Sequence, residues 1–462
     1  MSSRRASLAS TRSLRNEPTF TQTDMHERCY DEKSCINENV DCDHTTYSTL
    51  QINRSNNVHP PDVGFRPWLV ALGGFCGQFC SIGMINVIGV FIAYYQYNQL
   101  AGLSPSTISW IGSIQSFIFS FSGLLFCRLS DMYGPRWVTG CGGILITVGM
   151  VATAFCKEYY QFVLAQGICA SLGAAGLFYG PTTALSGWFY ARRGLAFGVA
   201  ASGASIGGIV LSSVFENLSA SVSFKAAVGA MAAVLFAFSL TATVATCSRL
   251  PPTEPQFTSQ WIKLYFRPFL EPVFSLYTAS MFLIYLGLYV PMAYLATSAI
   301  AEGVLTAHAL HIITYFNVGS FFGRVLLGLI SDKVNKFTLF SIITLIAGLV
   351  SAPFWYFSHS EATIIIVAVA NGFFTGGILA MFTALVAEIS PTEEVGTRIG
   401  AFSGVIAFAA LASLPIAGAI VGTDSNYNGL KIYGAVVLIA GAMIAASLSF
   451  RMAKEEHDSD DD

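Results

Sequence analysis

The sequence predicts an all-α membrane protein with twelve transmembrane helices in two six-helix halves and both termini in the cytosol. Composition, the spacing of apolar segments and the placement of Lys and Arg lead to this prediction. Of 462 residues, 53% are hydrophobic and 11% are charged. Soluble domains carry about 25% charged residues, more than twice this share. Apolar segments of about 20 residues span a bilayer as helices, because a helix pairs its backbone N–H and C=O groups internally and hydrocarbon offers these groups no other partner.

Twelve apolar segments follow one another between short polar turns. Their predicted ranges are 68–94, 106–129, 137–155, 160–189, 195–216, 224–246, 271–299, 306–330, 337–357, 362–387, 398–421 and 431–450. With a cytosolic N-terminus, the inner loops and C-terminus hold twelve Lys and Arg residues, and the outer loops hold only Lys157, Lys225 and Lys431. This bias predicts the orientation, because cytosolic loops are enriched in Lys and Arg.

Polar stretches divide the chain into five parts. The predicted order is a disordered cytosolic tail (1–61), a first six-helix half (62–247), a proline-rich cytosolic linker (248–268), a second half (269–450) and an acidic cytosolic tail (451–462). The first tail has too few apolar residues to bury a core.

The two halves repeat each other. Asp131 follows the second span as Asp332 follows the eighth, and Arg193 opens the fifth span as Arg398 opens the eleventh. The offsets are 201 and 205 residues. A duplicated six-helix unit is typical of secondary transporters that rock about a central binding site.

Arg324 is the candidate binding residue of that site. It lies in the apolar eighth span, roughly 9 Å from the inner helix end at about 1.5 Å per residue. Intramembrane charge is expensive and usually functional. Asn317 and Ser320 precede it by seven and four residues, which predicts one polar helical face. The alternative is an arginine that snorkels to the inner interface.

Further polar residues within the spans are candidates for the same pocket, although each of them could instead bond a neighbouring helix. They are Gln78, Asn86, Tyr285, Tyr289 and Asn371. Small residues of the fifth span, such as Gly198, Gly203 and Gly207, predict close approach of helix backbones.

Charged residues at the inner loops are candidates for a gate that locks one transport state, with ordinary cytosolic loops as the alternative. They are Asp131, Arg136, Arg192, Arg193 and Asp332. Asn217 begins an outward-facing glycosylation sequon that lies so close to two helices that we expect it to be unused. No metal site is predicted, because Cys76 and Cys80 are better explained as small packing residues.

Three sequence motifs carry a family resemblance that covers roughly residues 62–450. The loop Asp131…Gly134…Arg136 resembles the signature of the major facilitator superfamily, with Cys127 at its leading glycine. The segment DVGFRPW at 62–68 resembles the first monocarboxylate-transporter motif, in the form found in fungal monocarboxylate porters and riboflavin carriers. The segment WFYARRGLAFG at 188–198 resembles the second motif, with Ala191 at its usual lysine.

The resemblance implies the major facilitator fold, alternating access and, often, proton-coupled movement of carboxylates. Arg324 matches the family's substrate-binding arginine. Ser320 stands where the family has an acidic residue, and Asn86 where it has a lysine. Both departures argue against simple lactate–proton symport and leave the substrate class open.

The leading hypothesis is a secondary transporter of a small organic anion, monocarboxylate-like, driven by a gradient that could be of protons. Alternatives are an efflux transporter for a fungal secondary metabolite, a riboflavin-type uptake carrier and a transport-dead nutrient sensor. An intramembrane enzyme is disfavoured, since no catalytic carboxylate or His pair lies at depth. We expect no cofactor, no nucleic acid partner and a monomer in the plasma membrane, with a vacuolar or other internal membrane as the alternative.

Overall fold

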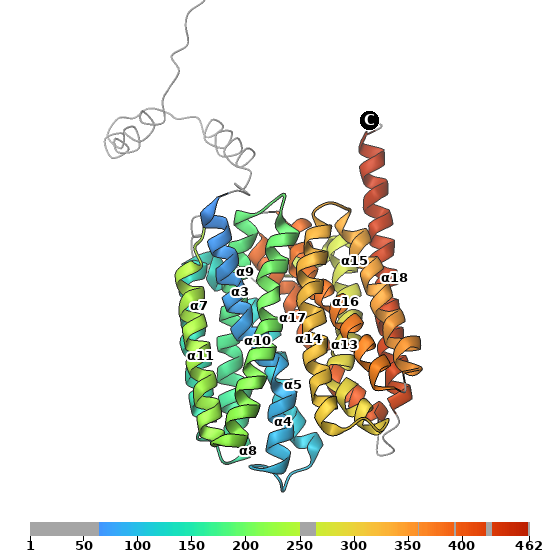
Figure 1. Cartoon of the computed structure of the whole chain (residues 1–462). Helices are drawn as coiled ribbons and strands as arrows, with labels where there is room; N and C mark the ends of the chain where they lie inside the picture. The colour runs from blue at the N-terminus through green and yellow to red at the C-terminus, as the bar shows by residue number, and fades with distance from the viewer. Residues whose placement is uncertain (1–63, 250–264, 359, 392–393, 422–426, 461–462) are drawn as a thin grey trace, which may run out of the picture. The chain divides into compact units, whose positions relative to one another are not determined.

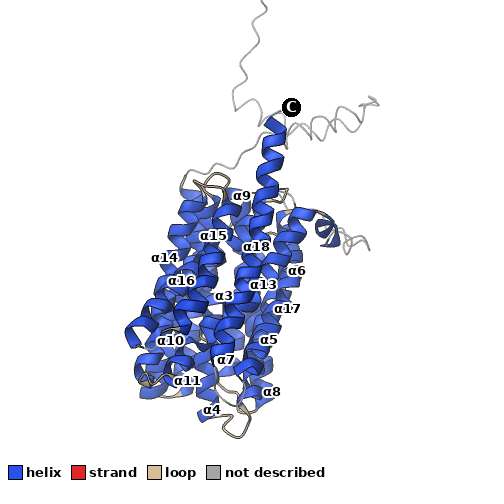
Figure 2. Cartoon of the chain, turned by 90° about the vertical axis from the view of Figure 1, so that its right-hand side faces the viewer, coloured by secondary structure: helices blue, strands red, loops and turns tan. Residues whose placement is uncertain are grey.

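The structure, a computed structural model, describes residues 64–249, 265–358, 360–391, 394–421 and 427–460. Within these ranges every regular element is a helix, and Figure 2 shows helices joined by short loops. The predicted fold class is confirmed. The expected N-terminal tail at 1–61 and most of the linker at 248–268 lie outside the described residues. The predicted acidic tail at 451–462 is helical as far as Asp460, where the description ends.

The first group of helices extends to residue 245. Its members are α3 (Phe65–Asn86), α4 (Ile88–Tyr97), α5 (Pro105–Phe121), α6 (Gly123–Tyr133), α7 (Pro135–Thr153), α8 (Tyr159–Phe162), the π-helix η3 (Val163–Ala170), α9 (Ser171–Trp188), α10 (Arg193–Ser221) and α11 (Phe224–Ala245). Several neighbours are parts of one span: α3 with α4, α5 with α6, and α8 with η3 and α9.

The second group begins after the linker. Its members are the 3₁₀ helix η4 (Arg267–Leu270), α13 (Pro272–Ala301), α14 (Thr306–Ser331), α15 (Lys336–Leu349), the π-helix η5 (Val350–Phe354), α16 (Glu361–Glu388), α17 (Val395–Val421) and α18 (Tyr427–Asp460). Helix α18 runs past 450, the predicted end of the twelfth span, and Figure 1 shows it extending beyond its neighbours.

Eleven helices in the described part of the chain are long and apolar enough to cross a membrane. The ninth predicted span is the remaining one. Its α-helical part, Lys336–Leu349, is short because the π-helix η5 continues the same segment to Phe354. A change from α to π geometry divides one apolar segment into two pieces without ending it.

Local sequence explains where several helices begin. Ser223 and Ser360 each accept a hydrogen bond from a backbone N–H of the helix that follows, and Asn335 accepts two. Such caps satisfy N–H groups that have no partner inside the helix. Between α6 and α7, Gly134 has a φ of 88°, which favours glycine, and Pro135 then opens α7.

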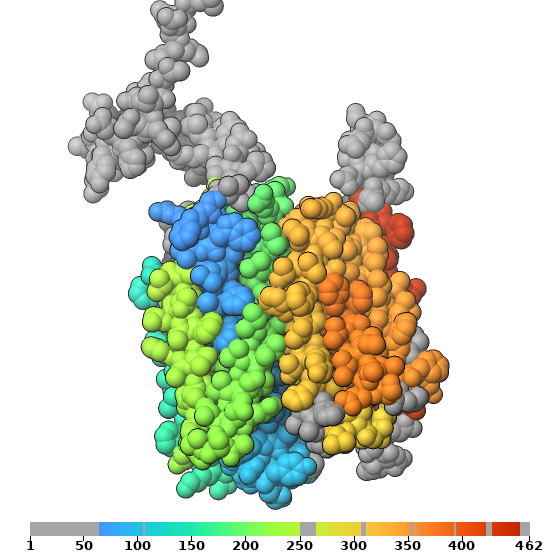
Figure 3. All heavy atoms as spheres, in the orientation of Figure 1, coloured from blue at the N-terminus to red at the C-terminus, as the bar shows by residue number. Residues whose placement is uncertain are grey.

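The two groups meet chiefly through α10 on one side and α17 on the other. Helix α10 packs against α14, and α17 packs against α5 and α6. Figure 1 shows α10 and α14 side by side, and Figure 3 shows their atoms in contact along the face turned to the viewer. These pairs are the surfaces that must separate if the groups move relative to each other.

The glycines of α10 allow this helix to approach its neighbours closely, as predicted. A Cβ at Gly198 would overlap the backbone oxygen of Arg324 in α14. Gly203 and Gly207 present the same close approach to α3. Because the contacting atoms are backbone, side-chain rotation cannot make room, so glycine is required for this spacing.

Candidate functional site

Arg324 is buried inside the bundle, with 2% of its surface exposed. Its Nη1 donates a hydrogen bond to the backbone oxygen of Ala201 in α10. Its Nε has no hydrogen-bond partner in the described part of the chain, and no carboxylate there lies within ion-pair distance. The guanidinium therefore faces the other helix group, and the alternative of snorkelling to an interface does not describe this structure.

Two tyrosines of α13 lie near this charge. Tyr285 and Tyr289 are close enough to Arg324 to interact with it electrostatically. Their rings contact each other edge to face with centroids 5.7 Å apart. Both predicted pocket tyrosines therefore lie in the surroundings of Arg324.

The other two polar candidates of α14, Asn317 and Ser320, lie against different helices. The carbonyl oxygen of Asn317 and the amide nitrogen of Asn86 would both lie 3.4 Å from a Cβ placed on Gly208 of α10. Asn86 donates to the backbone oxygen of Ala204. Ser320 is also buried, but its backbone oxygen lies against Gly376 of α16. Asn86, Asn317 and Arg324 thus follow the seam where α10 meets α14.

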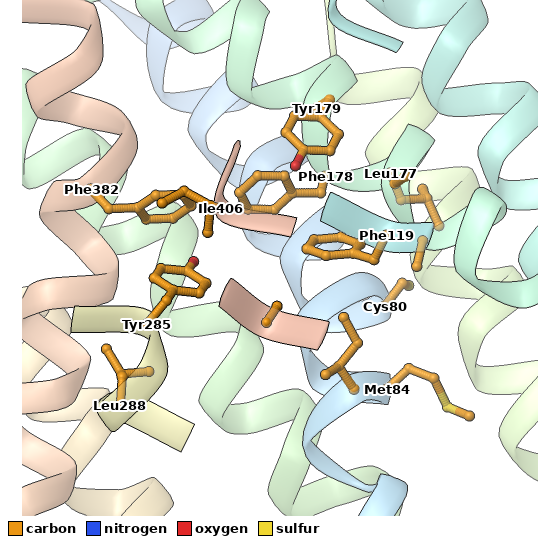
Figure 4. Packing of buried hydrophobic residues seen from close by; sticks show 14 of the residues in the cluster. Cys80, Met84, Phe119, Leu177, Phe178, Tyr179, Tyr285, Leu288, Phe382 and Ile406 are labelled. Carbon is orange, nitrogen blue, oxygen red and sulfur yellow. The ribbon is translucent and has the colours of Figure 1, made fainter. Parts of the chain in front are cut away.

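A small cavity lies between the two helix groups beside Tyr285. Its volume is about 10 Å³. It is lined by Phe119, Ser120, Tyr179, Tyr285, Phe382, Phe402, Ser403 and Ile406. Figure 4 shows Phe119 and Tyr179 on one side and Tyr285 and Phe382 on the other. A cavity of this size is at the limit for one water molecule, so the structure is closed around its centre.

Two predicted pocket residues and the sequon have other surroundings. Gln78 is buried in α3. Asn371 of α16 accepts a hydrogen bond of 2.7 Å from Ser351 in η5, so its carbonyl is already engaged by a neighbouring helix. Asn217 is exposed near the end of α10, where its amide donates to the backbone oxygen of Ser213. Its sequon is therefore part of a helix.

Asp332 joins the two groups at the end predicted to face the cytosol. Its carboxylate accepts hydrogen bonds of 2.7 and 2.8 Å from the backbone amides of Gly194 and Leu195, in the first turn of α10. A carboxylate at a helix N-terminus is stabilised by the unpaired N–H groups there. Burial raises the pKa of Asp332, and these two amides act in the opposite direction.

Asp131 occupies the equivalent position in the first group. A Cβ placed on Gly396, in the first turn of α17, would lie 2.5 Å from both of its carboxylate oxygens. Each half therefore sends one aspartate to the beginning of a helix in the other half. The sequence repeat predicted this correspondence.

Arg193 is the third link at this end. It is 4% exposed, and its Nη1 donates to the backbone oxygen of Ala387 at 3.0 Å and to Glu388 of α16 at 3.3 Å. Glu388 also pairs with Lys336 at 2.8 Å. We call Asp131, Asp332, Arg193 and Glu388 the inner lock.

Comparison with known proteins identifies the family. A model of the Major Facilitator Superfamily matches residues 74–362 and 278–461. The chain belongs to this superfamily. It is similar to MFS-type transporter 1 of an Ophiocordyceps species, with 36% identity over 83% of this chain and 85% of that protein.

Two further fungal relatives are named as efflux proteins. The fujikurins efflux protein of Gibberella fujikuroi is 31% identical over 85% of this chain and 84% of its own length. The aspyridones efflux protein of Emericella nidulans is 32% identical over 84% and 80%. The crystal structure of the E. coli fucose:proton symporter matches with a TM-score of 0.63 and 14% identity, over 82% of this chain and 98% of that one, which shows the shared fold.

As a member of the major facilitator superfamily, the chain is a multi-pass membrane transporter. Two of its predicted gate residues, Arg136 and Arg192, lie outside the inner lock. Arg136 is exposed at the start of α7, and it makes no ion pair with the described residues. Arg192 is exposed at the N-cap of α10. A gating role for Arg136 and Arg192 stays a prediction.

Sequence reasoning missed two ion pairs that each hold a buried cation, one at each end of α13. Arg398 binds both carboxylate oxygens of Glu271, each at 2.6 Å. Lys431, which we expected in an outer loop, is 1% exposed in α18 and pairs with Glu302 at 2.5 Å. Hydropathy does not distinguish Glu271 or Glu302 from a loop residue, because the two glutamates flank the apolar segment of α13. The repeat did point to Arg398.

Sequence reasoning also missed Tyr265, just before η4. Its hydroxyl donates to the backbone oxygen of Leu124 in α6 at 2.5 Å. Burial raises the pKa of Tyr265. The end of the linker is thereby attached to the first helix group, close to the inner lock.

Proposed function

We propose that this protein exports a small, negatively charged secondary metabolite of the fungal type by alternating access. Arg324 carries the proposal. A buried guanidinium without a carboxylate partner is costly, since a charge in a medium of low dielectric constant is poorly solvated. An anionic substrate entering between the halves would supply the missing counter-charge. Tyr285 and Tyr289 would add hydroxyl hydrogen bonds, and Asn86 and Asn317 would line the same seam.

Export is favoured over uptake by the relatives. Two proteins that align with more than four fifths of this chain are named as efflux proteins for fungal metabolites. This favours the efflux alternative that the sequence left open. We propose that the exporter acts in the plasma membrane and as a monomer. The inner lock would hold the outward-facing state and release when substrate enters from the cytosol, because a ligand advances the cycle only if it binds one state better.

Transport into inside-out vesicles tests this proposal. We expect native vesicles to accumulate at least one anionic metabolite from a chemically diverse panel when a gradient is applied. Arg324→Ala should lower that accumulation at least about thirtyfold, because removing one partner of a buried charge pair costs about 2–5 kcal/mol. Arg324→Lys, which keeps the charge, should retain part of the transport.

Thermal melting of each variant serves as the control for folding. Transport by Arg324→Ala at the native rate would show that this residue does not bind substrate. Dependence of the rate on a proton gradient, compared with a sodium gradient, would identify the coupling ion.

Uptake of a monocarboxylate is the second candidate. The motif at 62–68 and the match of Arg324 to the monocarboxylate transporters favour it. Ser320 is the observation against it, because the acidic residue that would carry the proton is missing there. Uptake of lactate by right-side-out vesicles, absent from vesicles of Arg324→Ala, would favour this candidate over export.

A further inference from the structure

Aromatic rings form a continuous layer across the boundary between the two helix groups. Phe119, Phe178 and Tyr179 belong to the first group, and Tyr285, Phe382 and Phe402 to the second. We call these six residues the aromatic layer. Phe178 of α9 stacks on Phe382 of α16 across the boundary, with centroids 6.1 Å apart and planes inclined by 15°. Figure 4 shows Phe119, Phe178 and Tyr179 on one side and Tyr285 and Phe382 on the other.

Contacts within each wall hold the rings in place. Phe119 lies 5.4 Å from Phe178, and Tyr285 and Phe402 each lie 6.2 Å from Phe382. Gly123 leaves room for Tyr179, since a Cβ there would lie 2.6 Å from the Cζ of that ring. Three of the six residues are exposed by 2% or less, and the other three by no more than 8%. The walls are thus built before any ligand arrives.

Opening would separate the two walls. The Phe178–Phe382 contact would be lost, and both walls would present ring faces to the space that opens between them. A flat conjugated molecule can restore such contacts, because aromatic pairs attract each other beyond the effect of buried area. A saturated molecule of equal size buries similar area without restoring them.

Polar groups lie at two places around this layer. Arg324 is close enough to Tyr285 of the layer to interact with it electrostatically. The hydroxyl of Tyr179 donates to the backbone oxygen of Ser120 at 3.3 Å, beside Ser403. The arrangement offers one cation, two walls of rings and a few hydroxyls, which is the pattern of an apolar site with few orienting polar groups.

We propose that the substrate is a flat, conjugated organic anion whose rings insert into the aromatic layer while its charge binds Arg324. The proposal rests on the proposed function and specifies its substrate class. It predicts discrimination by shape and unsaturation as well as by charge, which a simple anion carrier would not show.

Three probes of matched skeleton test the proposal on the purified full-length protein in lipid nanodiscs. They are 2-naphthoate (flat and anionic), decahydro-2-naphthoate (anionic and saturated) and 2-naphthamide (flat and neutral). Isothermal titration calorimetry should show 2-naphthoate binding at least about fivefold more tightly than the saturated acid. It should also bind at least about tenfold more tightly than the amide, because only the acid neutralises Arg324.

A matched pair of variants assigns the preference to the layer. Phe382→Leu keeps an apolar side chain and removes the ring, so it should reduce the preference for 2-naphthoate about fivefold and leave the saturated acid unaffected. Phe236→Leu is the control, because Phe236 is 52% exposed on α11 and lies outside the layer. It should bind all three probes as the native protein does.

The outcomes separate the two proposals. Equal affinity for the flat and saturated acids, or no binding of 2-naphthoate, overturns the substrate class and leaves export of other anions intact. A clear preference for 2-naphthoate that Phe382→Leu removes supports the substrate class. If native vesicles then export no metabolite, the proposed function fails while the binding preference stands.

Discussion

Replacing Gly328 of α14 by alanine should loosen the boundary between the two helix groups. A Cβ at this position would lie 2.7 Å from the backbone oxygen of Gly194 and 3.2 Å from the Cα of Gly198, both in α10. Ordinary contact begins at 3.4 Å, so α10 and α14 must move apart by about 0.7 Å. The neighbours are backbone atoms of another helix, and no side chain can rotate to absorb the overlap.

The expected cost follows from overpacking in well-packed interiors, about 1–3 kcal/mol. Because α10 and α14 belong to different groups, this cost falls on the closed arrangement more than on either group alone. It should shift the balance between closed and open states about 5- to 150-fold toward the state that opens near the inner lock.

Distances between spin labels at Arg136 and Val334 report this opening, since both positions are exposed at the predicted inner end. The labels would be placed in a variant without the native cysteines. Gly229→Ala is the matched control, because a Cβ at Gly229 of α11 meets nothing within 4 Å. We expect longer distances in Gly328→Ala only. Identical distance distributions and melting temperatures in both variants would refute the argument that this glycine sets the spacing.

Three other changes test contacts that join elements distant in sequence. Asp332→Asn should weaken the inner lock by about 1.5–3 kcal/mol, because a charged acceptor is lost, and the same spin labels would show no change if the carboxylate is unimportant. Tyr265→Phe should lower stability by about 1 kcal/mol through loss of the bond to Leu124, and an unchanged melting curve would contradict that. Lys431→Met should cost about 1–3 kcal/mol, because it removes the ammonium group from the carboxylate of Glu302, whose side chain is 21% exposed. Adding Glu302→Leu should recover most of this loss, and a double variant no more stable than the single one would exclude this explanation.

The positions of the spans follow directly from local sequence. A segment such as 224–246 is predicted as a helix from its own residues, because the bilayer requires internal backbone hydrogen bonds whatever surrounds the segment. The structure has this helix at Phe224–Ala245. The ninth span shows the limit of that reasoning, since hydropathy does not register the change from α to π geometry at Val350.

Part of the candidate site was also within reach of the sequence. Arg324 stood out because an ionised group is rare at this depth. Asp131 and Asp332 were visible because they follow corresponding spans of the two halves. Their charge and spacing are local properties. The partners of these residues are not, since Asp332 binds amides of Gly194 and Leu195, which lie 138 and 137 residues away.

Which aromatic residues face each other depends on how the helices pack. Phe178 and Phe382 are two of 36 phenylalanines in the chain, and nothing near them in sequence distinguishes them from those that face lipid. The prediction that Lys431 lies in an outer loop was wrong for the same reason. Its burial depends on Glu302 and on the ring of Trp355, which are distant in sequence. Hydropathy and charge act within one segment, whereas contacts between helices depend on the relative rotation and depth of two segments, which no single stretch of residues encodes.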